Sequence, residues 1–530
     1  MDNPIFEEYL QALHSINPTI NDFFMRDEWG NKNHIQPNIY SEEYFKEENS
    51  MNKYFLKKLE KSDKLSFHEK IFKEDLETDI HTEEGYNIFY YMPVNMRNNI
   101  LINYVGSCSG EGWFTFSVKK DYLDFLKRLE SLDDITNEII KKMKYGIRDK
   151  VTLYEKTVGK MIDNINEILK TKSYTHTKKK IPISKKKWDE SVNKYLVKNL
   201  KKLNNFLIDD YIEHASKECG LHQYKGGKGA YKFICKNETL PELTPELLFK
   251  CGMDEIERIN KEKNSLEKKI GKGDIDEYIH NETDDYYNDE KNIFNDIDKI
   301  KKEIIRDTYS KYFHGEIKKE DDYQVKSVRV EDNSHFAFYR WGDIKMKKKG
   351  TFYINTFNPK EINKHELYVL TLHEGIPGHH YEINYHLNRN VGDYFRSSPY
   401  DNYSEGWGLY CESLGNYSNP KREYFRLKYD MLRSIRLVID TGIHYFGWDY
   451  EKCFHFMKDH LKSKDEAIHR ALLRYIDNPG QALTYKIGQK TILYLREQHI
   501  QKGGNIKDFH EKIMRLGPCP IDALLNYFIE

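Results

Sequence analysis

The sequence predicts a mainly α-helical protein. Segments such as 121–132 and 157–170 place apolar residues three and four positions apart, which is the period of a helix that buries one face. The same period returns after Asn363 in the apolar segment 364–372 and continues towards the end of the chain. We therefore expect helices on both sides of the chain's middle.

A small β-sheet is expected between these two helical regions. Near residue 325 the helical period gives way to short stretches in which β-branched and aromatic residues alternate with other residues. The stretches are 324–330, 335–341 and 350–357. We expect one continuous body with a helical N-terminal lobe over 1–322 and a second lobe over 323–530, in which the sheet precedes the helix 364–372.

The composition excludes several classes of protein. The 530 residues include 84 Lys and Arg against 85 Asp and Glu, so a formal charge of −1 provides no field for holding nucleic acid or an anionic membrane. Aromatic residues make up 14% of the chain, which is too many for a disordered polyelectrolyte. The sequence predicts a folded protein with a sizeable core and with neither nucleic acid nor membrane as a partner, and it leaves the oligomeric state open.

The cysteines and the first residues indicate the compartment. The sequence has no run of 18 apolar residues, and its first thirty residues lack the basic and apolar segments of a signal peptide. Seven cysteines are scattered singly without a CxxC pair, which is typical of free thiols in a reducing compartment. We expect a cytoplasmic protein.

The strongest local motif is HEGIPGHH, residues 373–380. It begins like HExxH, in which two histidines one helical turn apart hold Zn²⁺ while the glutamate activates a water. His373 would then be a zinc ligand and Glu374 the base. The alternative is that His373 and Glu374 only end a core helix and the later histidines lie on its surface.

The spacing leaves the second histidine ligand open. His379 and His380 follow His373 by six and seven positions, and on a regular helix neither reaches the same ion. The intervening Pro377 and Gly378 break a helix and tolerate strained dihedral angles, so an irregular turn could carry His379 back towards the metal. We expect His379 to be the ligand and keep His380 as the alternative.

A third ligand is expected from a second acidic motif, EGWGLYCE, at residues 405–412. A catalytic zinc site with two histidines needs a carboxylate, here from a separate helix. Glu405 and Glu412 are seven residues apart and share one helix face, so one could bind metal while the other supports it. We expect Glu405 to be the ligand; the alternative is an ordinary salt-bridged helix face.

These two motifs resemble the hallmarks of the domain-of-unknown-function 885 (DUF885) family, HEAxPGHH and EGWALYxE. Two further hallmarks of the family are similar to residues 436–444 and 474–488. Weaker similarity extends over 243–259, 350–357 and 508–525, so the resemblance covers most of the chain. Gly375 and Gly408 stand where the family usually has alanine.

The resemblance implies a single, largely helical body, related at its active site to the gluzincin metallopeptidases, with the zinc helix at the wall of an internal cleft. It also implies that one Zn²⁺ is held by His373, His379 and Glu405. In the expected reaction the metal polarises a peptide carbonyl and lowers the pKa of a water toward ~7, and Glu374 passes the proton to the leaving amine.

Other residues are candidates for binding the substrate. We expect His444 and Tyr485 to donate hydrogen bonds to the developing oxyanion; the alternative for each is a structural position in the core. Arg436 and Arg474 could pair with a peptide carboxylate, although an arginine on a helix more often forms a structural ion pair. The strand Thr351–Thr356 could hold an extended peptide at a sheet edge, which favours peptides as substrates.

The leading hypothesis is therefore a zinc-dependent metallopeptidase that acts on oligopeptides. Two alternatives are a metal-dependent amidohydrolase that acts on a small amide and a catalytically silent metal-binding scaffold. Glu374 argues against the scaffold, because a purely structural metal site has no use for a base beside its ligand. The sequence leaves the choice between exopeptidase and endopeptidase open.

Overall fold

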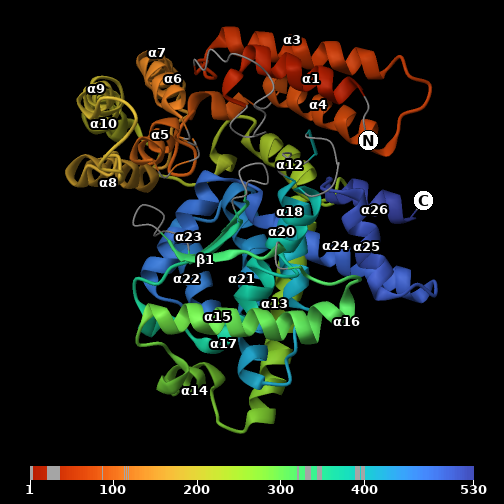
Figure 1. Cartoon of the computed structure of the whole chain (residues 1–530). Helices are drawn as coiled ribbons and strands as arrows, with labels where there is room; N and C mark the ends of the chain where they lie inside the picture. The colour runs from red at the N-terminus through yellow and green to blue at the C-terminus, as the bar shows by residue number, and fades with distance from the viewer. Residues whose placement is uncertain are drawn as a thin grey trace.

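The computed structural model shows a mainly helical body with one small sheet, as the sequence predicts (Figure 1). The residues that it describes are 4–20, 36–85, 87–110, 112, 114, 116, 118–318, 321–328, 336–342, 349–387, 394–395 and 400–529. Among these, no helix is long and apolar enough to cross a membrane.

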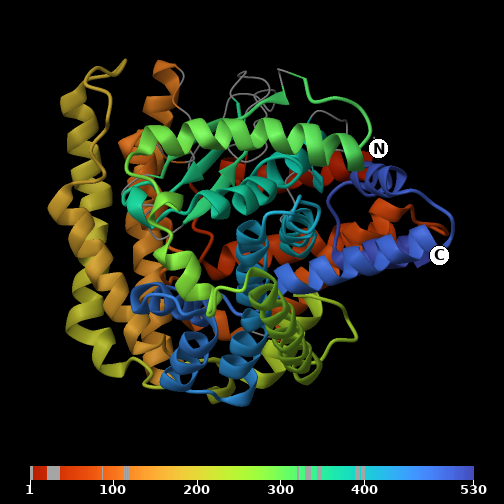
Figure 2. The same ribbon diagram turned by 90° about the horizontal axis from the view of Figure 1, so that it is seen from below.

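The first part of the chain forms a layer of helices on one side of the molecule (Figure 1). Seen from below, its orange to gold helices stand side by side, on the side of the molecule opposite the C-terminus (Figure 2). Helix α8 covers the predicted segment 157–170, and α6 covers 121–130 of the predicted segment 121–132, whose last residue begins α7. The helices of this layer are α1 (Pro4–Ile16), α3 (Glu42–Leu59), α4 (Phe67–Gly85), α5 (Ile100–Ser109), α6 (Lys119–Glu130), α7 (Leu132–Asp149), α8 (Glu155–Thr171), α9 (Lys185–Ser191), α10 (Lys198–Phe206) and α11 (Ile212–His214).

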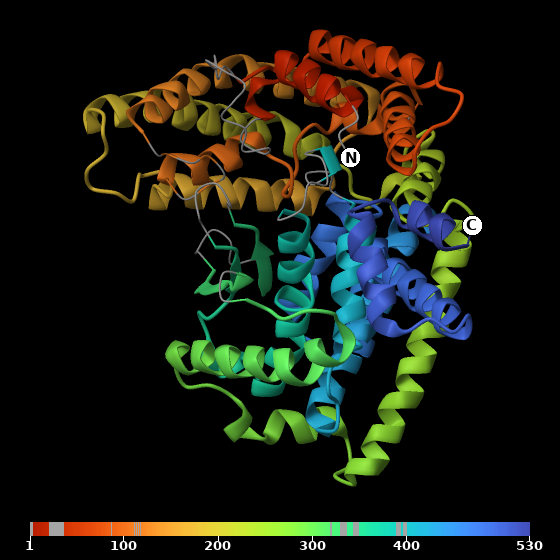
Figure 3. The same cartoon turned by 45° about the vertical axis from the view of Figure 1, so that its right-hand side comes forward.

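The next segment connects this layer to the rest of the body. The long helix α13 extends away from the N-terminal layer (Figure 3) and packs along α21. Helix α15 buries Ile293, Ile297, Ile300 and Ile304, which are spaced at helical intervals, and packs against α17. The helices of this segment are α12 (Gly227–Glu238), α13 (Pro245–Ile270), α14 (Ile275–Asn281), α15 (Glu290–Ile304) and α16 (Ser310–Tyr312).

The sheet has three strands in the order β1-β3-β2. Strand β1 (Gln324–Ser327) runs parallel to β3 (Thr351–Ile354), and β2 (Ala337–Arg340) runs antiparallel to it. Strand β3 is therefore central, and its backbone groups are paired on both sides. The expectation that Thr351–Thr356 offers a free sheet edge to a peptide is wrong for the strand itself, because the edges are β1 and β2.

The remaining helices form the part of the body that carries the motifs. Helix α20 packs against α24, and α17 packs against both α20 and α21. These helices are α17 (Lys364–Glu374), α18 (His379–Leu387), α20 (Asp401–Glu412), α21 (Pro420–Thr441), α22 (Tyr450–Leu461), α23 (Asp465–Asp477), α24 (Gln481–Gln501), α25 (Ile506–Leu516) and α26 (Ile521–Ile529).

The hydrophobic clusters cross residue 322. One cluster joins Phe72 and Ile297 to Tyr368 and Trp407, all of them fully buried. A second cluster joins residues of α13 to residues of α21, α22 and α23. Apolar side chains from before and after residue 322 therefore pack together in the same clusters.

Candidate metal centre

The first histidine of the centre lies in the last turn of α17. The side chain of Asn363 accepts a hydrogen bond from the backbone of His365 and caps the start of this helix. The helix ends at Glu374, because Gly375 leaves the helical region with φ −100° and ψ −128°. His373 and Glu374 are 3% and 7% exposed, so both lie at the buried end of α17.

An irregular turn then brings the second histidine back to the first. A Cβ atom at Gly378 would lie 1.9 Å from the carbonyl oxygen of His373, so only glycine allows the chain to approach so closely. The carbonyl of Pro377 accepts a hydrogen bond of 2.9 Å from Nε1 of Trp407, which fixes the turn to α20. As a result the ring centres of His373 and His379 lie 4.7 Å apart.

Glu405 on α20 completes the group. Its Oε2 atom lies 3.5 Å from Nε2 of His373 and 3.4 Å from Nε2 of His379. Two ligands bound at 2.0–2.2 Å to a tetrahedral zinc ion lie roughly 3.3 Å apart, so these separations suit one shared ion. In the part of the chain that the structure describes, these residues are the one cluster of His, Cys, Asp and Glu with metal-binding spacing.

The electrostatics favour a charged carboxylate in this cluster. Burial by itself would raise the pKa of Glu405, but hydrogen bonds and charge from the two imidazoles hold it well below its usual range. Burial likewise disfavours charge on His373, but Glu405 and Glu412 outweigh it and raise the pKa of His373 to about 9. The ionised form of Glu405 is the form that binds a metal.

His380 faces away from this cluster. Its Nε2 donates a hydrogen bond of 2.6 Å to the carbonyl of Asp321, and its Nδ1 accepts one of 2.9 Å from the Tyr339 hydroxyl. Burial lowers the pKa of His380 to about 4, so it is neutral with both nitrogens engaged. The structure therefore groups His379, and not the alternative His380, with His373 and Glu405.

Groups behind the two histidines orient their rings. Oε1 of Glu412 lies 2.8 Å from Nδ1 of His373, and Arg433 on α21 lies 3.4 Å from the same carboxylate oxygen. The Nδ1 atom of His379 donates to Ser404 at 3.4 Å, and Ser404 donates to Glu382 at 3.2 Å. Each contact engages Nδ1 and leaves Nε2 towards Glu405, which is how metal-binding histidines are usually held.

Of these supporting residues, the sequence identified only Glu412. Glu382 and His386 are four residues apart on α18, and Oε1 of Glu382 lies 3.3 Å from Nε2 of His386 in the interior. Their spacing was the available signal, but an i,i+4 pair is common on solvent-exposed helices. Ser404 and Arg433 carry no local signal, since their role depends on how α20 and α21 pack against the histidines.

Glu374 follows His373 directly, and one of its two carboxylate oxygens has no hydrogen-bond partner among the described residues. Its Oε2 atom is buried and makes no hydrogen bond with the described residues. Burial raises the pKa of this carboxyl above its usual value, and the nearby imidazoles counteract part of that rise. A carboxylate with a raised pKa next to a metal site has the properties of a general base.

The two expected oxyanion donors differ in position. The hydroxyl of Tyr485 on α24 donates to Oε1 of Glu405 at 2.9 Å, so Tyr485 lies at the centre. His444 is fully buried elsewhere: its Nδ1 accepts from the backbone of Leu221 and its Nε2 donates to the carbonyl of Tyr475. The role expected for His444 as an oxyanion donor is wrong, because both of its nitrogens are already satisfied by backbone groups.

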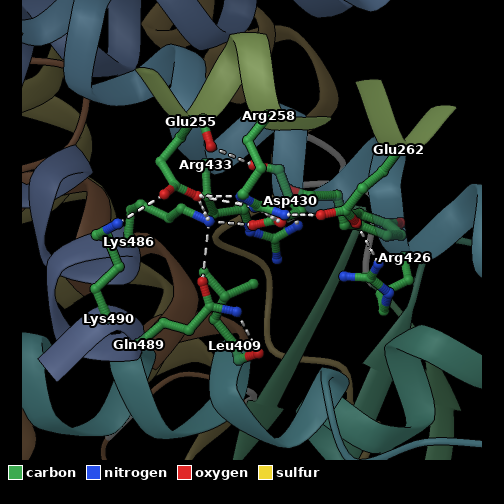
Figure 4. A network of polar contacts seen from close by, with 12 residues as sticks. Glu255, Arg258, Glu262, Leu409, Arg426, Asp430, Arg433, Lys486, Gln489 and Lys490 are labelled. Carbon is green, nitrogen blue, oxygen red and sulfur yellow. Dashed lines mark hydrogen bonds and ion pairs between the residues drawn. The ribbon is translucent and has the colours of Figure 1, made fainter. Parts of the chain in front are cut away.

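A buried charge network supports the helices of the centre (Figure 4). Lys486, next to Tyr485 on α24, is 1% exposed and forms ion pairs with Asp430 of α21 and with Glu255 of α13, the latter at 3.0 Å. Lys486 also donates to Gln489, whose amide in turn donates to the carbonyl of Leu409 on α20. The network thus connects α13, α21 and α24 to the helix that carries Glu405.

Two solved structures share this fold over nearly the whole chain. A candidate lipoprotein from Colwellia psychrerythraea is 22% identical with a TM-score of 0.85, and the match covers 99% of this chain and 97% of that one. A candidate lipoprotein of unknown function from Shewanella oneidensis is 15% identical with a TM-score of 0.73, and the match covers 99% of both chains. No curated protein matches the sequence.

The family comparison agrees with the motifs. The model described as "Bacterial protein of unknown function (DUF885)" matches residues 25–526, which is most of the chain. The centre described above lies wholly inside the matched region. The chain therefore belongs to the DUF885 family.

Proposed function

We propose that the protein is a zinc-dependent metallopeptidase that hydrolyses oligopeptides. The observation that carries the proposal is the cluster of His373, His379 and Glu405, whose ligand atoms lie within 4.8 Å of one another, with Glu374 beside it. A structural zinc site is closed by four protein ligands, whereas a catalytic site has three and keeps one position open. Three ligands and an adjacent carboxylate fit the catalytic kind.

The metal and Glu374 have separate roles in the proposed hydrolysis. Bound Zn²⁺ would supply a Lewis acid and lower the pKa of a water toward ~7. Glu374 removes a proton from the attacking water as its oxygen bonds to the peptide carbonyl carbon. The same carboxyl then delivers that proton to the leaving nitrogen as the C–N bond breaks, which yields an acid and an amine.

Tyr485 is the candidate for stabilising the transition state. Its buried hydroxyl donates its one proton to Glu405, so Tyr485 lies next to the position where charge develops on the carbonyl oxygen and would turn its O–H from Glu405 to that oxygen as the charge develops. A fixed donor at such a position typically contributes ~10²–10³ in rate. The seven free cysteines, six of them buried, support the proposal that this chemistry takes place in a reducing compartment such as the cytoplasm.

Metal content tests the ligand set. Purified wild type, His379→Ala and His380→Gln are loaded with zinc, dialysed and measured by mass spectrometry. We expect about one zinc per chain in wild type and in His380→Gln, and a large loss in His379→Ala, because His379 faces Glu405 and His380 does not. A wild type that takes up no zinc would refute the proposal.

Catalysis is tested separately with Glu374→Gln. This change keeps the shape of the side chain but removes the base, so we expect zinc to be retained and peptide hydrolysis to fall by roughly 10²–10⁴-fold. Cleavage is followed on a mixture of short peptides and on small amides. Full hydrolysis by the variant would show that Glu374 is not the base, and cleavage of small amides alone would assign the protein to the amidohydrolases.

A further inference from the structure

Two arginines flank Tyr485. The guanidinium carbon of Arg436 lies 4.3 Å from the centre of the Tyr485 ring, and Nη2 of Arg474 donates to the Tyr485 hydroxyl at 2.8 Å. Arg436 is 8% exposed, and its Nη1 atom is buried without a hydrogen-bond partner, as is Nε of Arg474. Within the described residues, neither arginine forms an ion pair with a carboxylate.

Neighbouring arginines are paired in the ordinary way. Arg433 lies 3.4 Å from Glu412, and Arg422 donates to Glu303 at 3.0 Å. Arg474, in contrast, approaches carboxylates only through neutral side chains. It donates to Gln481, which donates to Asp401, and to Tyr485, which donates to Glu405.

This arrangement leaves positive charge without a counter-ion. A guanidinium is always charged, and a largely buried charge is costly unless it is paired. When Glu405 binds a metal, its negative charge is shared with that ion and offsets the arginines even less. Planar guanidinium groups bind carboxylates through two parallel hydrogen bonds, so a carboxylate is the expected partner.

We propose that Arg474, supported by Arg436 through the ring of Tyr485, binds the terminal carboxylate of the substrate. The inference rests on the proposed peptidase function and places the cleaved bond near the carboxy end of the peptide. Arg474 is half-buried and contacts the substrate directly, whereas Arg436 is buried and acts through the aromatic ring.

The distances agree with cleavage close to the end of a peptide. The Tyr485 hydroxyl links the two groups: it accepts a hydrogen bond of 2.8 Å from Nη2 of Arg474 and donates one of 2.9 Å to Oε1 of Glu405. An extended chain advances by at most ~3.3–3.6 Å per residue. A carboxylate one or two residues beyond the scissile carbonyl can therefore reach Arg474 while that carbonyl lies at the metal centre.

The test compares two forms of one peptide, which differ only in whether the C-terminus is a free carboxylate or an amide. Zinc-loaded protein hydrolyses acetyl-Ala-Phe-Ala with a free carboxylate and the same peptide as its C-terminal amide, and kcat/KM is measured for both. Because the acid gains charge-assisted hydrogen bonds, we expect it to be preferred by roughly 10- to 100-fold. Arg474→Gln should reduce this ratio towards one, mainly through KM of the acid.

A matched control and a binding measurement separate recognition from folding. Arg470→Gln makes the same change one turn earlier on α23, at an exposed position, and should keep the preference. Calorimetric titration of zinc-free protein with the two peptides should show the acid binding more tightly in wild type and in Arg470→Gln, but not in Arg474→Gln. If Arg474→Gln does not fold by circular dichroism, Arg474→Lys keeps the charge without the planar fork and should reduce the preference only in part.

The outcomes distinguish the two proposals. Equal hydrolysis of acid and amide by wild type would overturn the carboxylate site and leave the peptidase function standing. No hydrolysis of either peptide would overturn the peptidase function, and the titration of zinc-free protein would still decide the carboxylate site. An amide that ends in aspartate and is cleaved as well as the free acid would assign the site to a side-chain carboxylate and overturn its assignment to the chain terminus.

Discussion

Oε1 of Glu412 lies 2.8 Å from Nδ1 of His373, the ring nitrogen that does not face Glu405. A carboxylate behind a metal-binding histidine fixes its ring orientation and increases its basicity. Glu412 is seven residues after Glu405 on α20, so one helix provides both the ligand carboxylate and the carboxylate behind His373. The EGWGLYCE motif therefore places two carboxylates two helical turns apart on α20, both directed at His373.

Glu412→Gln should weaken zinc binding. The amide keeps the size of the side chain but removes its charge, so we expect zinc affinity to fall roughly 10- to 100-fold while the fold is retained. The dissociation constant is measured by competition with a chromogenic chelator. Glu466→Gln, at an exposed position of α23, is the matched control, and an unchanged affinity in Glu412→Gln would show that Glu412 is not needed to hold His373.

Gly408→Ala should also act on His373. A Cβ atom at residue 408 would lie 2.8 Å from Cε1 of the His373 ring, so the ring must move although Glu412 and Glu405 hold it. The family usually has alanine at this position, so the ring and its partners must be able to shift slightly, and we expect a measurable loss of zinc affinity of less than about tenfold.

The control for this change is Gly229→Ala. Residue 229 lies in α12, and no atom would come within 4 Å of its added Cβ. Alanine is also the better helix former, so this variant should keep its zinc affinity with equal or slightly higher stability. Equal zinc affinities in the two variants would mean that the His373 ring adapts without cost.

Lys486→Met should destabilise the fold. The change leaves Asp430 and Glu255 with one cation fewer in the interior, and removing one partner of a buried ion pair typically costs ~3–5 kcal/mol (Figure 4). Lys490→Met removes a second partner of Glu255, but the Lys490 side chain is 43% exposed, so its loss should cost about 1 kcal/mol or less. Urea unfolding measures both, and equal losses would mean that the interior pair is no more important than the surface pair.

The sequence predicted the parts of the centre that depend on local chemistry. Pro377 and Gly378 indicated an irregular turn, and the structure shows that turn bringing His379 to His373. The small sheet was predicted from its alternating residues, but the order of its strands was not, because strand order depends on long-range pairing. This is why Thr351–Thr356 is predicted at a sheet edge, whereas the strand formed within it, Thr351–Ile354, lies in the middle.

His444 shows what local sequence patterns cannot predict. It belongs to a motif of its own, as Tyr485 does, and no feature of the two motifs favours one of these residues as a donor. The two residues differ in position. Backbone groups of Leu221 and Tyr475, distant in sequence, satisfy both nitrogens of His444, whereas the hydroxyl of Tyr485 donates a hydrogen bond to Glu405 in the metal centre. Tertiary packing therefore decides which of the two side chains lies at the metal centre.

Asp440 should make stability depend on pH. It is fully buried, and burial raises its pKa to about 7, although Tyr231 and the backbone of Gly480 donate hydrogen bonds to its Oδ1. An unfolded aspartate has a pKa of ~3.9, so between these values the folded state binds more protons and the free energy of unfolding falls as pH rises. Above the folded pKa the charged carboxylate is buried and the loss is complete.

Asp440→Asn removes this titration and keeps an oxygen that can accept both hydrogen bonds. Since the folded state of wild type holds Asp440 neutral at pH 5 and charged at pH 8, the stability of the variant relative to wild type should increase by roughly 2–3 kcal/mol between these two values. The buried hydrogens of the new amide have no hydrogen-bond partner and add a cost that is the same at both pH values, so the difference between the two values isolates the titration. Urea unfolding at pH 5 and 8 measures it, with the exposed Asp209→Asn as the control. If the difference between variant and wild type were the same at both pH values, Asp440 would have to be ionised throughout, and a cation in the interior would have to compensate it.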